Sequence, residues 1–496
     1  MNLKERTASG TKWLALSSIA TISISILQLT LLARLIEPKE FGLLTIALMI
    51  LILVETYSDF GLSNIIIQSK KISETELSTL YWINNFISIG IFVLLFFGSD
   101  AIARLLHQPE LSIIIETLSV AFIIMPQGQQ CRALLQKEMA FTHISIVEIS
   151  AALVGFLVTM VCAWFKPVAL CAIWGFLSAV SLRMLMFCWF GRDIYQPTAV
   201  FQPDGVKSRL RYGGFLTADK LLGQISIHLP TIILSRAFGA VITGGYNLAL
   251  NMAVIAPARV NPILTRVLLP ALARIQDDQP RLRQNFYKIL AVTGLINFAV
   301  LLELMSVANN FVIVMFGAKW LFITPVLQIL CVAGLLQTIS KPANTLAMAT
   351  ALVDASATLN MLRLLISIPV LWLGIVSDGI IGAAFGFLAI QVLFCVLNYF
   401  YLLQPILGKS GKQYLYSLWT PLKLTLPIYA VSYLTGFLFD QLMPQTTLLA
   451  LQIVSGAVAF ILMISTSREA VITEAKSMLF RRIKLHNEIN KGNQVL

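Results

Sequence analysis

The feature that most constrains this chain is a series of about fourteen apolar segments, each about twenty residues long. A helix of that length crosses the roughly 30 Å hydrocarbon core of a bilayer. The chain is 57% hydrophobic and only 12% charged, so it lacks the polar surface that a soluble protein of 496 residues needs. The pattern therefore predicts an all-α polytopic membrane protein. The predicted spans cover approximately 13–36, 41–67, 77–98, 111–135, 141–166, 168–190, 213–238, 244–270, 286–316, 321–349, 355–377, 379–403, 414–438 and 446–466.

Charge in the connections orients the predicted bundle. One set of connections holds most of the cations: Lys70, Lys71, Arg132, Lys137, Arg192, Lys207, Arg209, Arg211, Arg274, Arg281, Arg283, Lys288, Lys409 and Lys412. The opposite set holds few: Arg34, Lys39, Arg104, Lys166, Arg236 and Lys319. Since cytoplasmic loops concentrate Lys and Arg, both termini are predicted to be cytoplasmic in a bacterial inner membrane. The net charge of +12 then reflects topology, and no basic soluble module for nucleic acid is present.

One stretch occurs twice. LLARLIEPKEFGLLTIAL (31–48) and ILSRAFGAVITGGYNLAL (233–250) align without a gap at an offset of 202 residues, with matches that include Arg34/Arg236 and Gly42/Gly244. Each copy spans an outer turn at the head of six predicted spans, which indicates two parallel six-helix repeats. We expect the copies to form equivalent helical hairpins, with the shared glycine placed where backbones crowd.

This repeat predicts five parts of the chain. They are an N-terminal six-helix bundle (1–190), a cytoplasmic linker (191–212), a second six-helix bundle (213–403), two additional transmembrane helices (404–466) and a cytoplasmic tail (467–496).

Enzyme signatures are absent from the sequence. No GxxxxGK[ST], GxSxG or HExxH motif occurs, and the six cysteines and four histidines show no metal-ligand spacing. Outer connections are short, the longest apparent one being 99–111, which leaves little room for an outer catalytic domain. We therefore expect no enzyme, no cofactor and no metal site.

Ionisable residues inside membrane spans are costly and are functional candidates by default. Cations occur within several spans of the second bundle, and an excess of positive charge there implies an anionic substrate, because Arg is well suited to binding phosphate or carboxylate. The pattern predicts an anion site in a central aqueous cavity, with Lys220, Arg259, Arg363, Gln224, Asn360 and Arg266 as candidate lining residues. Arg266 has a second interpretation as an anchor that reaches the interface, and Arg34 and Arg236 as caps of their spans.

Two acids lie four residues apart in the second predicted span. Glu55 and Asp59 share a helix face, so they are candidates for exchanging H⁺ or Na⁺ as a coupling ion. A structural salt bridge within the first bundle is the alternative.

The sequence also resembles a known family, the Wzx-type flippases of the multidrug/oligosaccharidyl-lipid/polysaccharide exporter superfamily, nearest to the colanic-acid-exporter-like branch. The residues that carry the resemblance are SGTKW (9–13), LLARLIEPKEFGLLTIAL (31–48), SDFGLSNIIIQ (58–68), LSTLYWIN (77–84), PQGQQCRALLQKEM (126–139), GGYNLALNMAVIAP (244–257), NPILTRVLLPALARIQDD (261–278) and ILGKSGKQYLYSLWTP (406–421).

This resemblance implies two six-helix bundles in a V shape, two extra helices and transport by alternating access. It implies an undecaprenyl-pyrophosphate-linked oligosaccharide as substrate, with membrane lipids and other polysaccharide-assembly membrane proteins as partners. It carries over no site residue. The alternatives are a drug or cation antiporter of the same superfamily, which needs a mainly acidic cavity, and a polysaccharide polymerase or ligase, which the short outer loops disfavour.

Overall fold

The computed structural model describes residues 3–58, 65–67, 72–202, 221, 223–254, 275, 278–349, 353–467 and 469. The described residues are helices and connections with no strand. Eleven helical stretches among them are long and apolar enough to cross a membrane. Two of these, Gly223–Val254 and Thr358–Leu407, each include parts of two predicted spans, and α2 (Pro38–Ser58) matches most of the remaining one. The predicted fold class, an all-α polytopic membrane protein, is confirmed.

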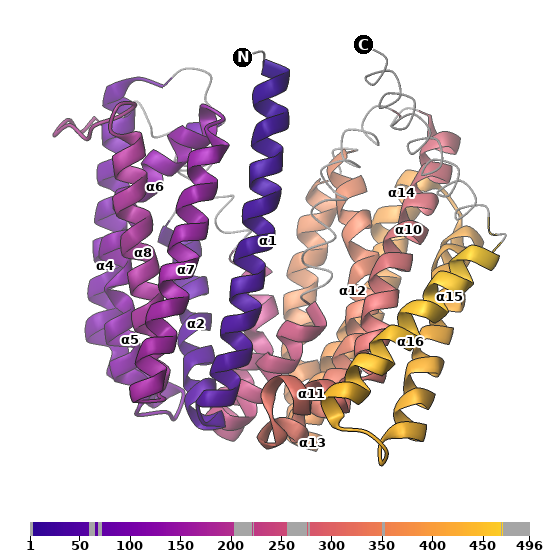
Figure 1. The fold of residues 1–496 in the computed structure, drawn as a ribbon. Coiled ribbons are helices and arrows are strands. Elements are labelled where there is room, and N and C mark those ends of the chain that lie inside the picture. The colour runs from indigo at the N-terminus through magenta and orange to yellow at the C-terminus, as the bar shows by residue number, and fades with distance from the viewer. Residues whose placement is uncertain are drawn as a thin grey trace, which may run out of the picture. The chain divides into compact units, whose positions relative to one another are not determined.

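The chain divides into two compact units. The first comprises Met1–Asn247, Met315–Trp320 and Ser367–Ala383. Its labelled helices are α1 (Leu3–Leu35), α2, α4 (Glu74–Leu105), α5 (Leu111–Ser119), α6 (Ala121–Lys137), α7 (Phe141–Phe165) and α8 (Ala169–Gly191). Within this unit α7 packs between α1 and α8, and α6 packs between α4 and α8 (Figure 1).

The second unit comprises Leu248–Val314, Leu321–Ile366 and Ala384–Leu496. Helix α10 is its centre, because α12, α15 and α16 all pack against it. The elements that lie wholly or partly in it are α10 (Gln279–Ser306), α11 (Ala308–Phe316), the 3₁₀ turn η2 (Ala318–Ile323), α12 (Thr324–Ala349), α13 (Val353–Asn398), the π turn η3 (Tyr399–Leu403), α14 (Gln404–Leu407), α15 (Gly411–Phe439) and α16 (Gln445–Thr466). The end of α11, the start of η2 and the middle of α13 belong to the first unit. The domain boundaries predicted from the repeat stay a prediction.

The two copies of the repeated motif turn at equivalent positions. Helix α1 ends at Leu35 and α2 begins at Pro38, with Glu37 between them. The residue 202 positions later is Gly239, whose φ of +79° interrupts the stretch Gly223–Val254. Gly42 and Gly244 lie against each other, since a Cβ built on Gly244 would be 2.8 Å from the Gly42 Cα. The expectation of backbone crowding at the shared glycine is confirmed.

A reciprocal set of hydrogen bonds closes the end of α1. Trp320 Nε1 donates to the Ala33 carbonyl at 2.8 Å, and Lys319 Nζ donates to the Arg34 and Ile36 carbonyls at 3.0 and 2.5 Å. In return, Arg34 Nε donates to the Met315 carbonyl at 3.0 Å. The last carbonyls of a helix have no partner within the helix, so these side chains satisfy acceptors that the helix itself cannot.

Some predicted boundaries were wrong. The connection expected at 99–111 is shorter, because α4 continues to Leu105. The span predicted at 111–135 consists of two helices, α5 and α6, that meet at Val120. The span predicted at 286–316 likewise divides into α10 and α11.

Candidate functional site

Arg363 is the one predicted cation of the anion site whose side chain the structure describes. It lies in α13, partly buried, and its Nη2 donates to Gln391 Oε1 at 2.8 Å. Its Cζ is 5.5 Å from the centre of the Phe394 ring. None of the ion pairs found among the described residues includes Arg363. Within that part of the chain, its positive charge is held by a neutral amide and an aromatic face.

Gln391 was not predicted from the sequence. Its side chain is 1% exposed and its Oε1 accepts the bond from Arg363, whereas its buried Nε2 has no hydrogen-bond partner among the described residues. A buried amide N–H without a partner is costly, so this N–H has unused capacity to donate to an acceptor. Together the guanidinium and this amide supply donors suited to an anionic oxygen. The only signal in the sequence was one Gln within the apolar run FGFLAIQVLFCVLN (385–398).

Two predicted amides are described in separate units. Asn360 is exposed in α13, three residues before Arg363, so the two share one side of the helix. Gln224 is partly buried in the stretch Gly223–Val254 and belongs to the first unit.

Four of the predicted site residues lie outside the described residues. They are Lys220, Arg259 and Arg266 of the predicted anion site and Asp59 of the predicted coupling pair. Their roles stay predictions.

The first unit contains a cavity of about 290 Å³ where ionisable side chains gather. Glu148 of α7 forms ion pairs with arginines of two other helices. Arg132 Nη2 of α6 lies 3.1 Å from Glu148 Oε1, and Arg183 Nε of α8 lies 3.0 Å from Glu148 Oε2. Glu55 of α2 also lines this cavity. With two guanidiniums and two carboxylates, the lining carries no formal excess of charge.

A further membrane acid of this unit, Glu116, is separate from that cluster. Glu116 of α5 has its Oε1 3.0 Å from Ser99 Oγ of α4 and 3.3 Å from Ser112 Oγ. The two acids therefore have different partners, Arg for Glu148 and Ser for Glu116. Arg132, which the sequence places among the cations of the predicted connections, forms an ion pair between helices α6 and α7.

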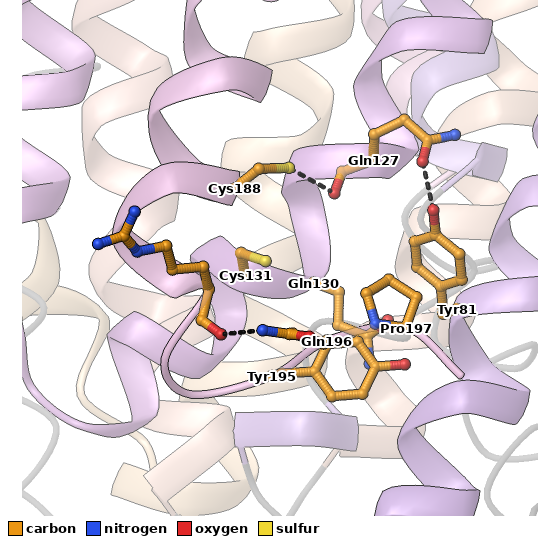
Figure 2. A pocket seen from close by; sticks show the side chains of 9 residues that line it. Tyr81, Gln127, Gln130, Cys131, Cys188, Tyr195, Gln196 and Pro197 are labelled. Atoms are coloured by element: carbon orange, nitrogen blue, oxygen red, sulfur yellow. Dashed lines mark hydrogen bonds between the residues drawn. The ribbon is translucent and has the colours of Figure 1, made fainter.

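A smaller cavity of about 200 Å³ lies where α4, α6 and α8 meet the chain after α8 (Figure 2). The Tyr81 hydroxyl donates to Gln127 Oε1, and Cys188 Sγ lies 3.4 Å from the Gln127 carbonyl. Tyr195, which follows α8, shares a 3.1 Å hydrogen bond with Ser78, and burial raises the pKa of its phenol. The polar contacts of this cavity are hydrogen bonds between neighbouring segments, which indicates a structural role rather than a catalytic or binding role. No cluster of three or more His, Cys, Asp or Glu side chains that could hold a metal occurs in the described part of the chain.

Comparison with known proteins places this arrangement in a family. Residues 31–325 match a family described as "Polysaccharide biosynthesis protein". The chain is 46% identical over 492 residues to the "Lipopolysaccharide biosynthesis protein WzxC" of Escherichia coli K12, covering 99% of this chain and 100% of that one. It is 40% identical over 486 residues to an "Uncharacterized membrane protein in cps region" of Klebsiella pneumoniae, covering 98% of this chain and 100% of that one.

The fold is also that of a solved transporter. A structure titled "Lipid II flippase MurJ, inward closed conformation" superposes with a TM-score of 0.71 at 17% identity, covering 91% of this chain and 98% of that one. At this identity the likeness shows the fold alone. The family match and the full-length identity to WzxC show more: this chain belongs to the polysaccharide biosynthesis protein family, in the WzxC-like branch of the Wzx-type exporters.

Proposed function

We propose that this protein is a flippase that moves an undecaprenyl-pyrophosphate-linked oligosaccharide repeat unit from the cytoplasmic to the periplasmic leaflet. The product supplies exopolysaccharide, capsule or O-antigen assembly. The observation that carries the proposal is the 46% identity to WzxC over the whole length of both chains. The protein then lies in the bacterial inner membrane with both termini in the cytoplasm. The unequal number of Lys and Arg residues in the two sets of connections supports that orientation.

In this proposal the second bundle recognises the diphosphate. Arg363 supplies a fixed positive charge, and the free Nε2 of Gln391 supplies a second donor beside it. The loss of hydration when a diphosphate leaves water is offset by such preorganised donors. Lys220, Arg259, Arg266, Gln224 and Asn360 are proposed to line the same aqueous path.

A deletion strain tests the function. Without a flippase, single lipid-linked units accumulate on the inner leaflet, and surface polysaccharide is lost. Without a polymerase, single units would instead reach the outer face. A deletion strain that exports normal polysaccharide and becomes sensitive to cationic drugs would overturn the proposal in favour of an antiporter.

Substitution of Arg363 tests the anion site. We expect Arg363→Gln to weaken diphosphate binding by about 1–3 kcal/mol, by analogy with hydrogen bonds to charged groups, and to reduce export without removing protein from the membrane. Arg363→Lys should restore export in part if charge alone matters, and little if the bidentate geometry matters. Arg104→Gln is the matched control, because Arg104 is exposed at the end of α4 and its Nε donates to a main-chain carbonyl of its own helix, that of Asp100. Full export by Arg363→Gln would contradict the site.

Coupling to an ion gradient is a separate part of the proposal. Glu55 and Asp59 are candidates to exchange H⁺ or Na⁺ during transport. We expect the double variant Glu55→Gln with Asp59→Asn to lose its response to an imposed ion gradient. Unchanged transport, with unchanged response to the gradient, would show that coupling lies elsewhere.

A further inference from the structure

One carboxylate in the second unit has not been assigned a role. Glu303 lies three residues before the end of α10, where α15 and α16 pack against that helix. Its Oε2 is 2.8 Å from Ser432 Oγ of α15, while its Oε1 is buried and has no hydrogen-bond partner among the described residues. Glu303 as a whole is partly buried, and a carboxylate with one buried oxygen and one bond to a neutral hydroxyl is poorly stabilised as an anion.

The charged groups around Glu303 do not neutralise it. In its own helix, Arg281, Arg283 and Lys288 lie in the first turns, at the opposite end. Helix α16 contains no charged residue, and α12 contains only Lys341, whose side chain is not described. On the α15 side, Lys423 lies in a different cavity, beside Glu469. Lys412 lies in the first turn of α15, far along that helix from Ser432, and Asp440, which follows α15, is itself acidic.

The hydrogen bonds fit a protonated acid. Ser432 Oγ is also 3.1 Å from the Gln452 carbonyl of α16. If Glu303 Oε2 carries a proton, it donates to Ser432 Oγ, and the Ser432 hydroxyl hydrogen is free to bond the Gln452 carbonyl. Both contacts are then satisfied with no charge in the membrane.

The space beside Oε2 suits a proton better than an alkali cation. A Cβ built on Gly456 would lie 2.2 Å from Glu303 Oε2 and 2.4 Å from Ser432 Oγ. A backbone packed this closely leaves no room for an additional ion between these oxygens.

A polar route leads outward from Ser432. Gln452 Nε2 donates to the Ser432 carbonyl at 3.0 Å, and Gln452 Oε1 accepts from Asn310 Nδ2 at 2.9 Å. Both amides line a cavity of about 720 Å³ at the end of α15, together with Asp440. Gln452 thus lines this cavity with its side chain and contacts Ser432 twice, through its side-chain amide to the Ser432 carbonyl and through its own carbonyl to the Ser432 hydroxyl.

We propose that Glu303 is a proton-exchange site, loaded through the cavity at Asn310 and Gln452 and relayed by the Ser432 hydroxyl. A hydronium ion in the cavity gives up H⁺ when the Gln452 side chain turns aside. The new O–H bond forms at Glu303, and water remains in the cavity. Only the coupling of this step to transport rests on the proposed flippase function, because protonation itself can be measured on the purified protein.

Infrared difference spectroscopy of the protein in lipid is the direct test. A protonated Glu303 should give a carboxylic-acid C=O band that is lost in Glu303→Gln, a variant that keeps the volume and the bond to Ser432. Glu116→Gln is the matched control, since Glu116 also contacts serine hydroxyls in a membrane helix, and it should keep the band. A wild-type spectrum with no such band, or a band unchanged in Glu303→Gln, overturns the proposal.

The route has its own test. In Gln452→Ala the side chain between the cavity and Ser432 is removed. The shift of the band after transfer to D₂O should then be faster, because water reaches Ser432 directly. An exchange rate equal to that of the wild type overturns the route. Export measured in the same variants separates the two proposals: Glu303→Gln should still flip substrate but lose stimulation by a proton gradient. Retained stimulation in Glu303→Gln rejects the coupling role while leaving the flippase function intact.

Discussion

The contact between Gly42 and Gly244 gives the sharpest prediction for stability. A Cβ built on Gly42 would lie 1.9 Å from the Ala240 carbonyl oxygen and 2.4 Å from its carbon. Ordinary contact begins at 3.4 Å, so the helices must separate by about 1.5 Å (3.4 − 1.9) to accept one methyl group. The obstacle is backbone, which has no rotamer to change. In membranes, close approach of small residues supplies much of the force between helices.

The magnitude follows from this geometry. At Gly244 the helices would have to separate by about 0.6 Å, since the atom nearest to an added Cβ is the Gly42 Cα at 2.8 Å and ordinary contact begins at 3.4 Å. Overpacking of a tight core costs about 1–3 kcal/mol, so Gly42→Ala should lie near the upper value and Gly244→Ala near the lower.

Thermal unfolding of the purified protein in detergent, followed by size-exclusion chromatography, measures the order. We expect Tm to fall most in Gly42→Ala, less in Gly244→Ala and not at all in the control Gly90→Ala, because nothing lies within 4 Å of a Cβ at Gly90. Equal Tm values for Gly42→Ala and Gly90→Ala would refute the reasoning.

Three further predictions address single contacts. Glu148→Gln removes the carboxylate that pairs with both Arg132 and Arg183, and should lower stability by about 1–3 kcal/mol. The cost is less than for a fully buried pair because these side chains are partly exposed, and thermal unfolding measures it. Trp320→Phe keeps a ring but loses the bond to the Ala33 carbonyl, and should cost about 1 kcal/mol in the same assay. Gly239→Ala should cost about 1–2 kcal/mol because its φ is +79°, while Gly239→Asn should cost less; equal Tm values for the two variants would contradict this.

Much of the fold was predictable because span length is fixed by the bilayer. The break predicted between 377 and 379 coincides with the non-helical Asp378 and with Gly379, whose φ is +53°. The repeat offset likewise located the turn at Gly239. Breaks inside apolar runs, such as those at Val120 and Val307, were missed because hydropathy does not change there.

The candidate sites were less predictable, since hydropathy tells which residues enter the membrane but not which helices meet. Gln391 became a candidate because it is hydrogen-bonded to Arg363, 28 residues earlier, and Glu303 because it is hydrogen-bonded to Ser432, 129 residues later. Each looks like an isolated polar residue in an apolar run, and no local spacing connects it to its partner.

Polarity inside the membrane is therefore a weak sign of function unless hydrogen-bonding capacity remains unused. Gln28 of α1, which belongs to a polar stripe along that helix, donates to Thr159 Oγ1 of α7 at 3.2 Å and so holds two helices together. Glu148 is neutralised by its two arginines. Several uncharged groups among the described residues also keep a buried atom without a partner. Two of the buried atoms without a partner differ from these uncharged groups because they belong to or adjoin an ionisable group. They are Gln391 Nε2, beside the guanidinium of Arg363, and Glu303 Oε1. An exporter must change the occupancy of its sites during each cycle, and groups with unused capacity next to a charge are the ones whose energy changes most when an anion or a proton arrives.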